Sequence, residues 1–168
     1  MRIVHARQEA VSGSGAYQNC SVLRTNSMKF LPNYFGKASI DKLFFCFPDP
    51  HFKRKNHPRR IISERLLAEY VFVLRPGTGR LYCITDVEEL HEWHVAKCDA
   101  HPLFERLADA DVATDPCVAA MRTATEEGQK VERNKGQKYY AVYQRLVAPT
   151  AAAASTSLSN FFAPTFPN

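Results

Sequence analysis

Apolar and polar positions divide the first third of the chain into three short segments. Residues 20–26 alternate and predict a strand, and residues 28–35 predict one short helical turn around Pro32. Residues 40–47 contain the apolar run LFFCF and predict a fully buried strand. This strand must end at Pro48-Asp49-Pro50, because proline lacks an N–H donor and has a fixed φ angle. Asp49 is therefore expected to be held stiffly at a strand end.

The rest of the chain predicts two helices and two further strands. Ser63 is a good N-cap for a helix over residues 64–74, whose apolar side chains fall on one stripe. Residues 79–85 predict a strand, residues 87–100 a second helix, and the alternating residues 138–146 a final strand at a sheet edge. Strands that alternate with helices in this way predict an α/β fold with a mostly parallel sheet.

The length of 168 residues predicts one domain. Residues 1–147 would form it, although residues 109–134 are polar and mixed. Residues 148–168 are low in charge and rich in small residues and proline, so we expect a disordered tail. No apolar stretch reaches the ~20 residues that span a membrane, and residues 1–5 lack the apolar core of a signal peptide. We therefore expect a protein that is neither membrane-bound nor secreted.

Neither the cysteines nor the histidines predict a metal site. The five cysteines are widely spaced and form no CxxC pair, which argues against a disulfide framework and against zinc. His91 and His94 have the i, i+3 spacing of two metal ligands, but no third ligand is evident. Surface or core histidines are the favoured interpretation.

The positive charge of the chain is concentrated in one segment. The net charge is +5, and residues 53–60 contain five basic and no acidic side chains, so the rest of the chain is neutral overall. The five are Lys53, Arg54, Lys55, Arg59 and Arg60. A concentrated basic patch is typical of contacts to nucleic-acid phosphates. The alternative is a turn followed by a solvated run of charges.

Two predicted strands end in an aspartate, namely Asp49 and Asp86. In an open α/β sheet, ligands bind at the carboxyl ends of the strands. Two acids at one rim, beside a basic cluster, indicate chemistry on a polyanion.

Four segments in order resemble the eukaryotic tRNA (guanine-46-N7)-methyltransferases. They are FPDPHFKRKNHPRRIIS, LLAEYVFVLRPGTGRLYCITDVEELHEWH, HPLFERL and TEEGQKVERNKGQKYYAVYQRL. The likeness covers roughly residues 17–146, and its most specific part is the proline-framed aspartate followed by the basic cluster. It implies a Rossmann-like methyltransferase fold, S-adenosylmethionine as the methyl donor and no metal.

The resemblance also implies roles for individual residues. Asp49 would be the active-site carboxylate, and Lys53 and Asp86 match positions that bacterial relatives use for substrate. The remaining basic residues of the cluster would contact tRNA. The expected cofactor-binding residues are Asn26, Ser27, Cys46, Thr125 and Glu127.

One part of the family pattern is missing from this sequence. The family has an upstream first strand with a glycine-rich turn and a second strand that ends in an acid, whereas Gly13 and Gly15 follow no strand here. We therefore expect an N-terminally truncated domain, in which the strand 43–47 has an open edge.

The truncation leaves a second interpretation, an inactive fragment that binds only tRNA or a partner subunit. In the family that partner is a WD40-repeat β-propeller, and the location is nuclear, or nuclear and cytoplasmic. A third interpretation is a basic domain that its tail recruits to replication. It rests on residues 155–162, which resemble a sliding-clamp docking peptide with serine in place of the expected glutamine.

Overall fold

The computed structural model describes residues 19–149, within which four strands form one sheet. The strands are β1 (Lys42–Cys46), β2 (Arg80–Thr85), β3 (Phe104–Arg106) and β4 (Tyr139–Arg145), in the spatial order β1-β2-β4-β3. β1 and β2 are parallel, whereas β4 runs antiparallel to both β2 and β3. The α/β class is confirmed, but the described sheet is mixed instead of mostly parallel.

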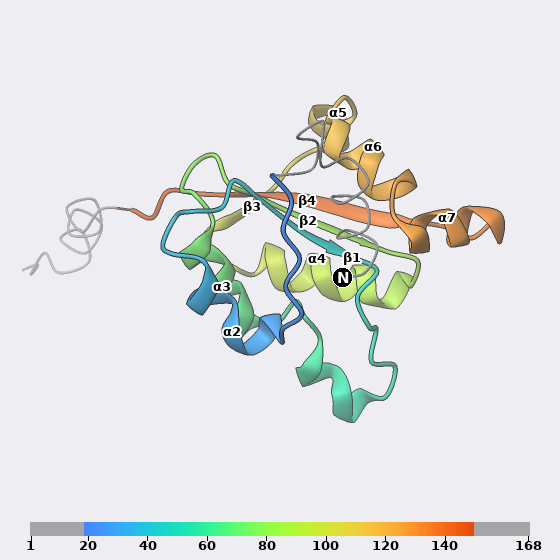
Figure 1. Ribbon diagram of the computed structural model, residues 1–168, viewed down its shortest axis with the longest axis horizontal. Helices are drawn as coiled ribbons and strands as arrows, with labels where there is room; N and C mark the ends of the chain where they lie inside the picture. The colour runs from blue at the N-terminus through green and yellow to red at the C-terminus, as the bar shows by residue number, and fades with distance from the viewer. Residues whose placement is uncertain (1–18, 150–168) are drawn as a thin grey trace, which may run out of the picture.

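Helices cover both faces of this sheet (Figure 1). α2 (Ser27–Tyr34), α3 (Glu64–Val73) and α4 (Glu88–Asp99) lie on one face, and α5 (Asp109–Val112) and α6 (Pro116–Thr123) lie on the other. α7 (Glu126–Arg133) lies beside the end at which β4 begins, and the 3₁₀-helix η1 (Arg54–Arg59) hangs below the end of β1. The predicted helices 64–74 and 87–100 correspond to α3 and α4. Ser63 is the N-cap of α3, but its side chain makes no capping hydrogen bond.

The central position of β2 follows from its sequence, because alternate side chains of a strand point to opposite faces. Leu81 and Cys83 enter the core beneath α3 and α4, while Tyr82 and Ile84 enter the core beneath α5 and α6. A strand that is apolar on both faces is covered on both sides, and β2 divides the hydrophobic core into these two halves.

The sheet is mixed because of where β4 enters it. α7 brings the chain to the carboxyl end of β2, where Tyr139 pairs with Thr85. β4 then runs back along β2, which makes it antiparallel, and β3 pairs with its far side. The strand predicted at 138–146 is confirmed, but its predicted position at the edge of the sheet is wrong. The edge position next to β4 is taken by β3, whose three residues are too few to show a periodic pattern in the sequence.

β1 is the edge strand of the described sheet, so the strand predicted at 43–47 does have an open edge there. It is also shorter and more exposed than predicted: it begins at Lys42, and its residues alternate between exposed and half-buried. Phe44 stacks on Tyr82 at 4.5 Å between ring centroids yet remains 39% exposed. An apolar run in the sequence does not show whether a strand pairs with neighbours on both edges or, like β1 in the described sheet, on one edge.

Two further segments differ from the prediction. Residues 20–26 form no strand but lead as coil into α2, whose first turn is capped by the Asn26 side chain. Their apolar and polar residues alternate as in a strand, but they pair with no neighbouring strand in the described sheet. The polar segment 109–134 contains α5, α6 and α7, and its signals were the capping residues Asp115 and Thr125. The predicted turn at 28–35 is a full helix, α2.

Within residues 19–149, no helix has the length and apolar character that a membrane crossing requires. The predicted disordered tail and the sliding-clamp likeness lie almost wholly outside the described residues, as do Gly13 and Gly15.

Candidate functional site

The carboxyl ends of β1 and β2 form one rim of the sheet. The parallel pairing continues one residue beyond β1, where the Phe47 N–H donates to the Ile84 carbonyl at 2.8 Å. Asp49 follows β1 and Asp86 follows β2, and both are exposed. The structure therefore brings the two strand-end acids to the same rim, as the sequence indicated.

The backbone on either side of Asp49 has an unusual conformation. Phe47 and His51 adopt positive φ angles of 51° and 47°, which non-glycine residues rarely do. Each such residue costs roughly 1–3 kcal/mol, and strain of this kind is concentrated at functional sites. Asp49 Oδ1 accepts a hydrogen bond from the His51 N–H at 2.9 Å, while the carboxylate stays 71% exposed. This segment, residues 47–51, is called the elbow below. It fixes one oxygen of the Asp49 carboxylate and leaves the carboxylate accessible.

Four basic side chains beside this elbow form what we call the basic segment: Lys53, Arg54, Lys55 and Arg59. All four are exposed on η1 or at its N-cap. None of them pairs with an acid among the residues that the structure describes. Four uncompensated cations in seven residues fit an exposed phosphate-binding surface.

Arg60 does not belong to this surface, although the sequence placed it there. Its side chain is 1% exposed and forms an ion pair with Glu89 at 2.8 Å. The hydrogen bond and charge of Arg60 lower the pKa of the Glu89 carboxyl. The guanidinium also lies over the Trp93 ring, 4.8 Å from its centroid. Arg60 thus offers no exposed cation beside the basic segment, and sequence alone could not separate this inward-facing arginine from its neighbours.

α7 brings Thr125 and Glu127 to the same rim. Thr125 Oγ1 accepts a capping hydrogen bond from the Gly128 N–H at 3.0 Å. Glu127 forms an ion pair with Lys130 at 2.8 Å. The pKa of Lys130 is raised mainly by Glu127 and further by the Asp86 carboxylate, which places α7 next to the end of β2.

The remaining expected cofactor residues are more scattered. Cys46 is exposed at the last position of β1, beside the rim. Asn26 and Ser27 lie at the start of α2, on the side of the sheet that α3 and α4 cover. Asn26 Oδ1 accepts the capping hydrogen bond from Met28 N–H at 3.1 Å, which leaves its amide N–H groups for a ligand. Within residues 19–149, no hydrogen bond or ion pair joins Asn26 or Ser27 to the rim residues.

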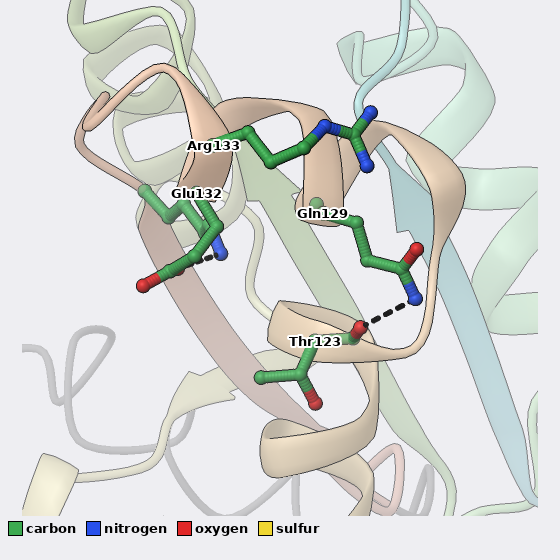
Figure 2. A pocket seen from close by; sticks show the side chains of 6 residues that line it. Thr123, Gln129, Glu132 and Arg133 are labelled. Carbon is green, nitrogen blue, oxygen red and sulfur yellow. Dashed lines mark hydrogen bonds and ion pairs between the residues drawn. The ribbon is translucent and has the colours of Figure 1, made fainter.

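A groove of about 360 Å³ beside α7 was not anticipated from the sequence (Figure 2). Gln129 Nε2 donates to the Thr123 carbonyl at 3.3 Å, and Lys138 Nζ donates to Glu132 at 2.6 Å. The spacing of Gln129, Glu132 and Arg133 along one helix face was the only available signal.

The two histidines of α4 have separate environments. The His94 side chain is fully buried, which lowers its pKa to about 4, with further lowering by His91 and Arg60. His91 instead stacks on Tyr139 with ring centroids 5.7 Å apart. Within residues 19–149, no group of three or more His, Cys, Asp or Glu side chains is placed to hold a metal ion.

Comparison with known proteins assigns the chain to a family. The model of a family described as "Putative methyltransferase" matches residues 2–141. The chain belongs to this methyltransferase family. It is 55% identical over 148 residues to a protein of Kluyveromyces lactis named tRNA (guanine-N(7)-)-methyltransferase, covering 88% of the chain and 52% of that relative. Proteins of the same name from Chaetomium globosum and Candida albicans are 57% and 59% identical over 81% and 80% of the chain, and over 46% and 41% of their own lengths. The chain thus spans about half the length of the curated relatives it matches.

Proposed function

We propose that this chain contributes the catalytic rim of a tRNA methyltransferase that methylates guanine 46 at N7, in the variable region. The observation that supports this most is the exposed Asp49 carboxylate, fixed on a strained elbow beside the basic segment. The names of the relatives and the family described above support the same reaction and substrate class.

The chemistry explains why a carboxylate serves here. Guanine N7 carries a lone pair and no proton, so methylation requires no strong general base. The base becomes cationic as the N–CH₃ bond forms, and a carboxylate preorganised beside it stabilises that charge. Asp49 can also accept hydrogen bonds from the N1–H and N2–H₂ edge of guanine, which orients N7 for attack.

The basic segment would help to bring the guanine to the Asp49 carboxylate. A guanine inside folded tRNA has to leave its stack before it reaches a protein carboxylate, which costs a few kcal/mol. Contacts from Lys53, Arg54, Lys55 and Arg59 to phosphates would offset this cost and fix the register of the RNA.

We infer that S-adenosylmethionine is the methyl donor, which supplies an electrophilic methyl group on a sulfonium. The polar groups of the expected cofactor residues, at the rim and at the start of α2, have the chemistry that such a ligand needs. The Glu127 carboxylate is exposed to accept hydrogen bonds from its hydroxyl or amino groups, and Asn26 retains free amide donors. Thr125 shapes the turn through its cap, and Cys46 offers an apolar contact at the end of β1.

Mass spectrometry of the RNA product tests the proposal. The purified chain is incubated with an unmodified tRNA and S-adenosylmethionine, and the RNA is digested and mapped. We expect 7-methylguanosine at position 46, its loss in Asp49→Ala, and its retention in the matched control Asp41→Ala, an exposed acid before the opposite end of β1. Equal activity of both variants, or methylation at another atom, would contradict the assignment.

A second function, tRNA binding without methyl transfer, is favoured by one observation. The basic segment is complete within the described residues, whereas the expected cofactor residues are spread over α2, β1 and α7. A chain of this kind would bind tRNA but show no binding of S-adenosylmethionine.

Two proposals rest on the family resemblance alone. We propose a WD40-repeat β-propeller as partner subunit and a nuclear location. Co-purification of the tagged chain with such a propeller tests the first, and fluorescence imaging of the tagged chain tests the second.

A further inference from the structure

Arg60 joins three segments that are separate in sequence. Its Nε donates to the Pro50 carbonyl at 2.9 Å, next to Asp49. Its Nη2 donates to Glu89 Oε1 at 2.8 Å and lies 3.1 Å from His57 Nε2. Pro50 belongs to the elbow, His57 to η1, and Glu89 to the first turn of α4.

Only an arginine makes this set of contacts. The guanidinium carries several donors in a planar fork, whereas the lysine ammonium is a single point charge. Arginine has no acceptor, so in the 3.1 Å contact with His57 Nε2 the Nη2 group can only donate. The flat face of the guanidinium lies over Trp93, whose Nε1–H donates to the Ile62 carbonyl at 2.7 Å. Trp93 is thereby anchored against the guanidinium of Arg60.

These contacts connect the two halves of the rim. The Pro50 carbonyl follows Asp49 directly, and Glu89 lies three residues after Asp86. We propose that Arg60 is a positioning residue, which holds the Asp49 elbow against the first turn of α4 and so fixes the Asp49 carboxylate relative to the Asp86 side of the rim. Its importance for catalysis rests on the proposed function, but its effect on the elbow does not.

Amide hydrogen exchange of the purified chain tests the structural half of the proposal. The variant Arg60→Met retains the aliphatic volume and removes every donor. We expect exchange at residues 49–59 to become at least tenfold faster, while the β2 amides 81–84 keep their protection. The matched control is Arg75→Met, because Arg75 also forms a 2.8 Å pair, with Asp41, but that pair is exposed. Unchanged exchange at 49–59, or equal acceleration in β2, would overturn the proposal.

A split between binding and rate tests the positioning half. In Arg60→Met we expect the single-turnover rate of methyl transfer to fall by about 10- to 100-fold, since misplacement by about 1 Å has effects of that size. The Kd for tRNA should change by less than about threefold. Arg60→Lys should behave like Arg60→Met, and full rescue by lysine would show that only the charge is needed. If the wild-type chain transfers no methyl group, the proposed function fails, while the exchange experiment still decides whether Arg60 holds the elbow.

Discussion

The salt dependence of tRNA binding separates Arg59 from Arg60, which are neighbours in sequence and differ completely in burial. Arg59 is exposed, whereas Arg60 is 1% exposed and paired with Glu89. Each phosphate contact contributes about 0.7–0.9 to the slope of log K against log salt concentration. The basic segment has four exposed cations, so we expect a slope of about −2.8 to −3.6. Doubling the salt concentration would then weaken binding roughly tenfold.

Replacing Arg59 with Ala should remove one contact. The slope should become shallower by about 0.7–0.9, and doubling the salt should weaken binding only about four- to sixfold. Replacing Arg60 with Met should leave the slope unchanged. Fluorescence anisotropy of labelled tRNA, titrated between about 50 and 300 mM salt, measures both variants. An unchanged slope in Arg59→Ala, or an equal loss in Arg60→Met, would refute the surface as described.

Three further predictions concern stability. Burial holds His94 neutral with a pKa of about 4, so the unfolded chain takes up a proton there first as the pH falls below about 6.5. His94 should therefore lower the free energy of unfolding by about 2 kcal/mol between pH 7 and 5; His91 and His101, whose pKa values burial also lowers, add to the total drop, and only the His94 share should vanish in His94→Leu. Gly128→Ala would place a Cβ 2.8 Å from Thr125 Oγ1 and should destabilise the start of α7 by about 1–3 kcal/mol in urea denaturation, whereas an unaffected midpoint would show that the turn adapts. Asp115 caps α6 and accepts from the buried Tyr82 hydroxyl at 2.8 Å, so Asp115→Ala should cost about 2–4 kcal/mol and Asp115→Asn clearly less; equal costs would contradict the capping role.

The pattern of apolar and polar residues was sufficient to predict helices that bury one stripe of apolar side chains and the strand that buries both of its faces. α3, β2 and α4 lie where the apolar periodicity placed them, because burial drives both the pattern and the structure. The position of β4 was not recognisable, because strand order depends on where α7 delivers the chain and not on the strand itself. The coil at 20–26 shows the same limit, since alternation becomes a strand only with a pairing partner.

The candidate site was predictable to a similar degree. The prolines around Asp49 and the acids that end β1 and β2 identified the rim, because a strand's direction and its end are properties of local sequence. The burial of Arg60 was not predictable, because its partner Glu89 lies 29 residues away on another element. The groove beside α7 was missed for the same reason, since it forms only when α6, α7 and the start of β4 come together.

Calorimetric titration of the purified chain with S-adenosylmethionine tests the central claim most directly. The proposal that this rim is the catalytic site of a methyltransferase predicts binding with a Kd on the order of 1–100 μM, or about 5–8 kcal/mol. Binding should weaken in Glu127→Ala and persist in Arg59→Ala. If a folded chain binds tRNA with the expected salt slope but gives no heat with S-adenosylmethionine, the claim is contradicted, and tRNA binding alone is its function.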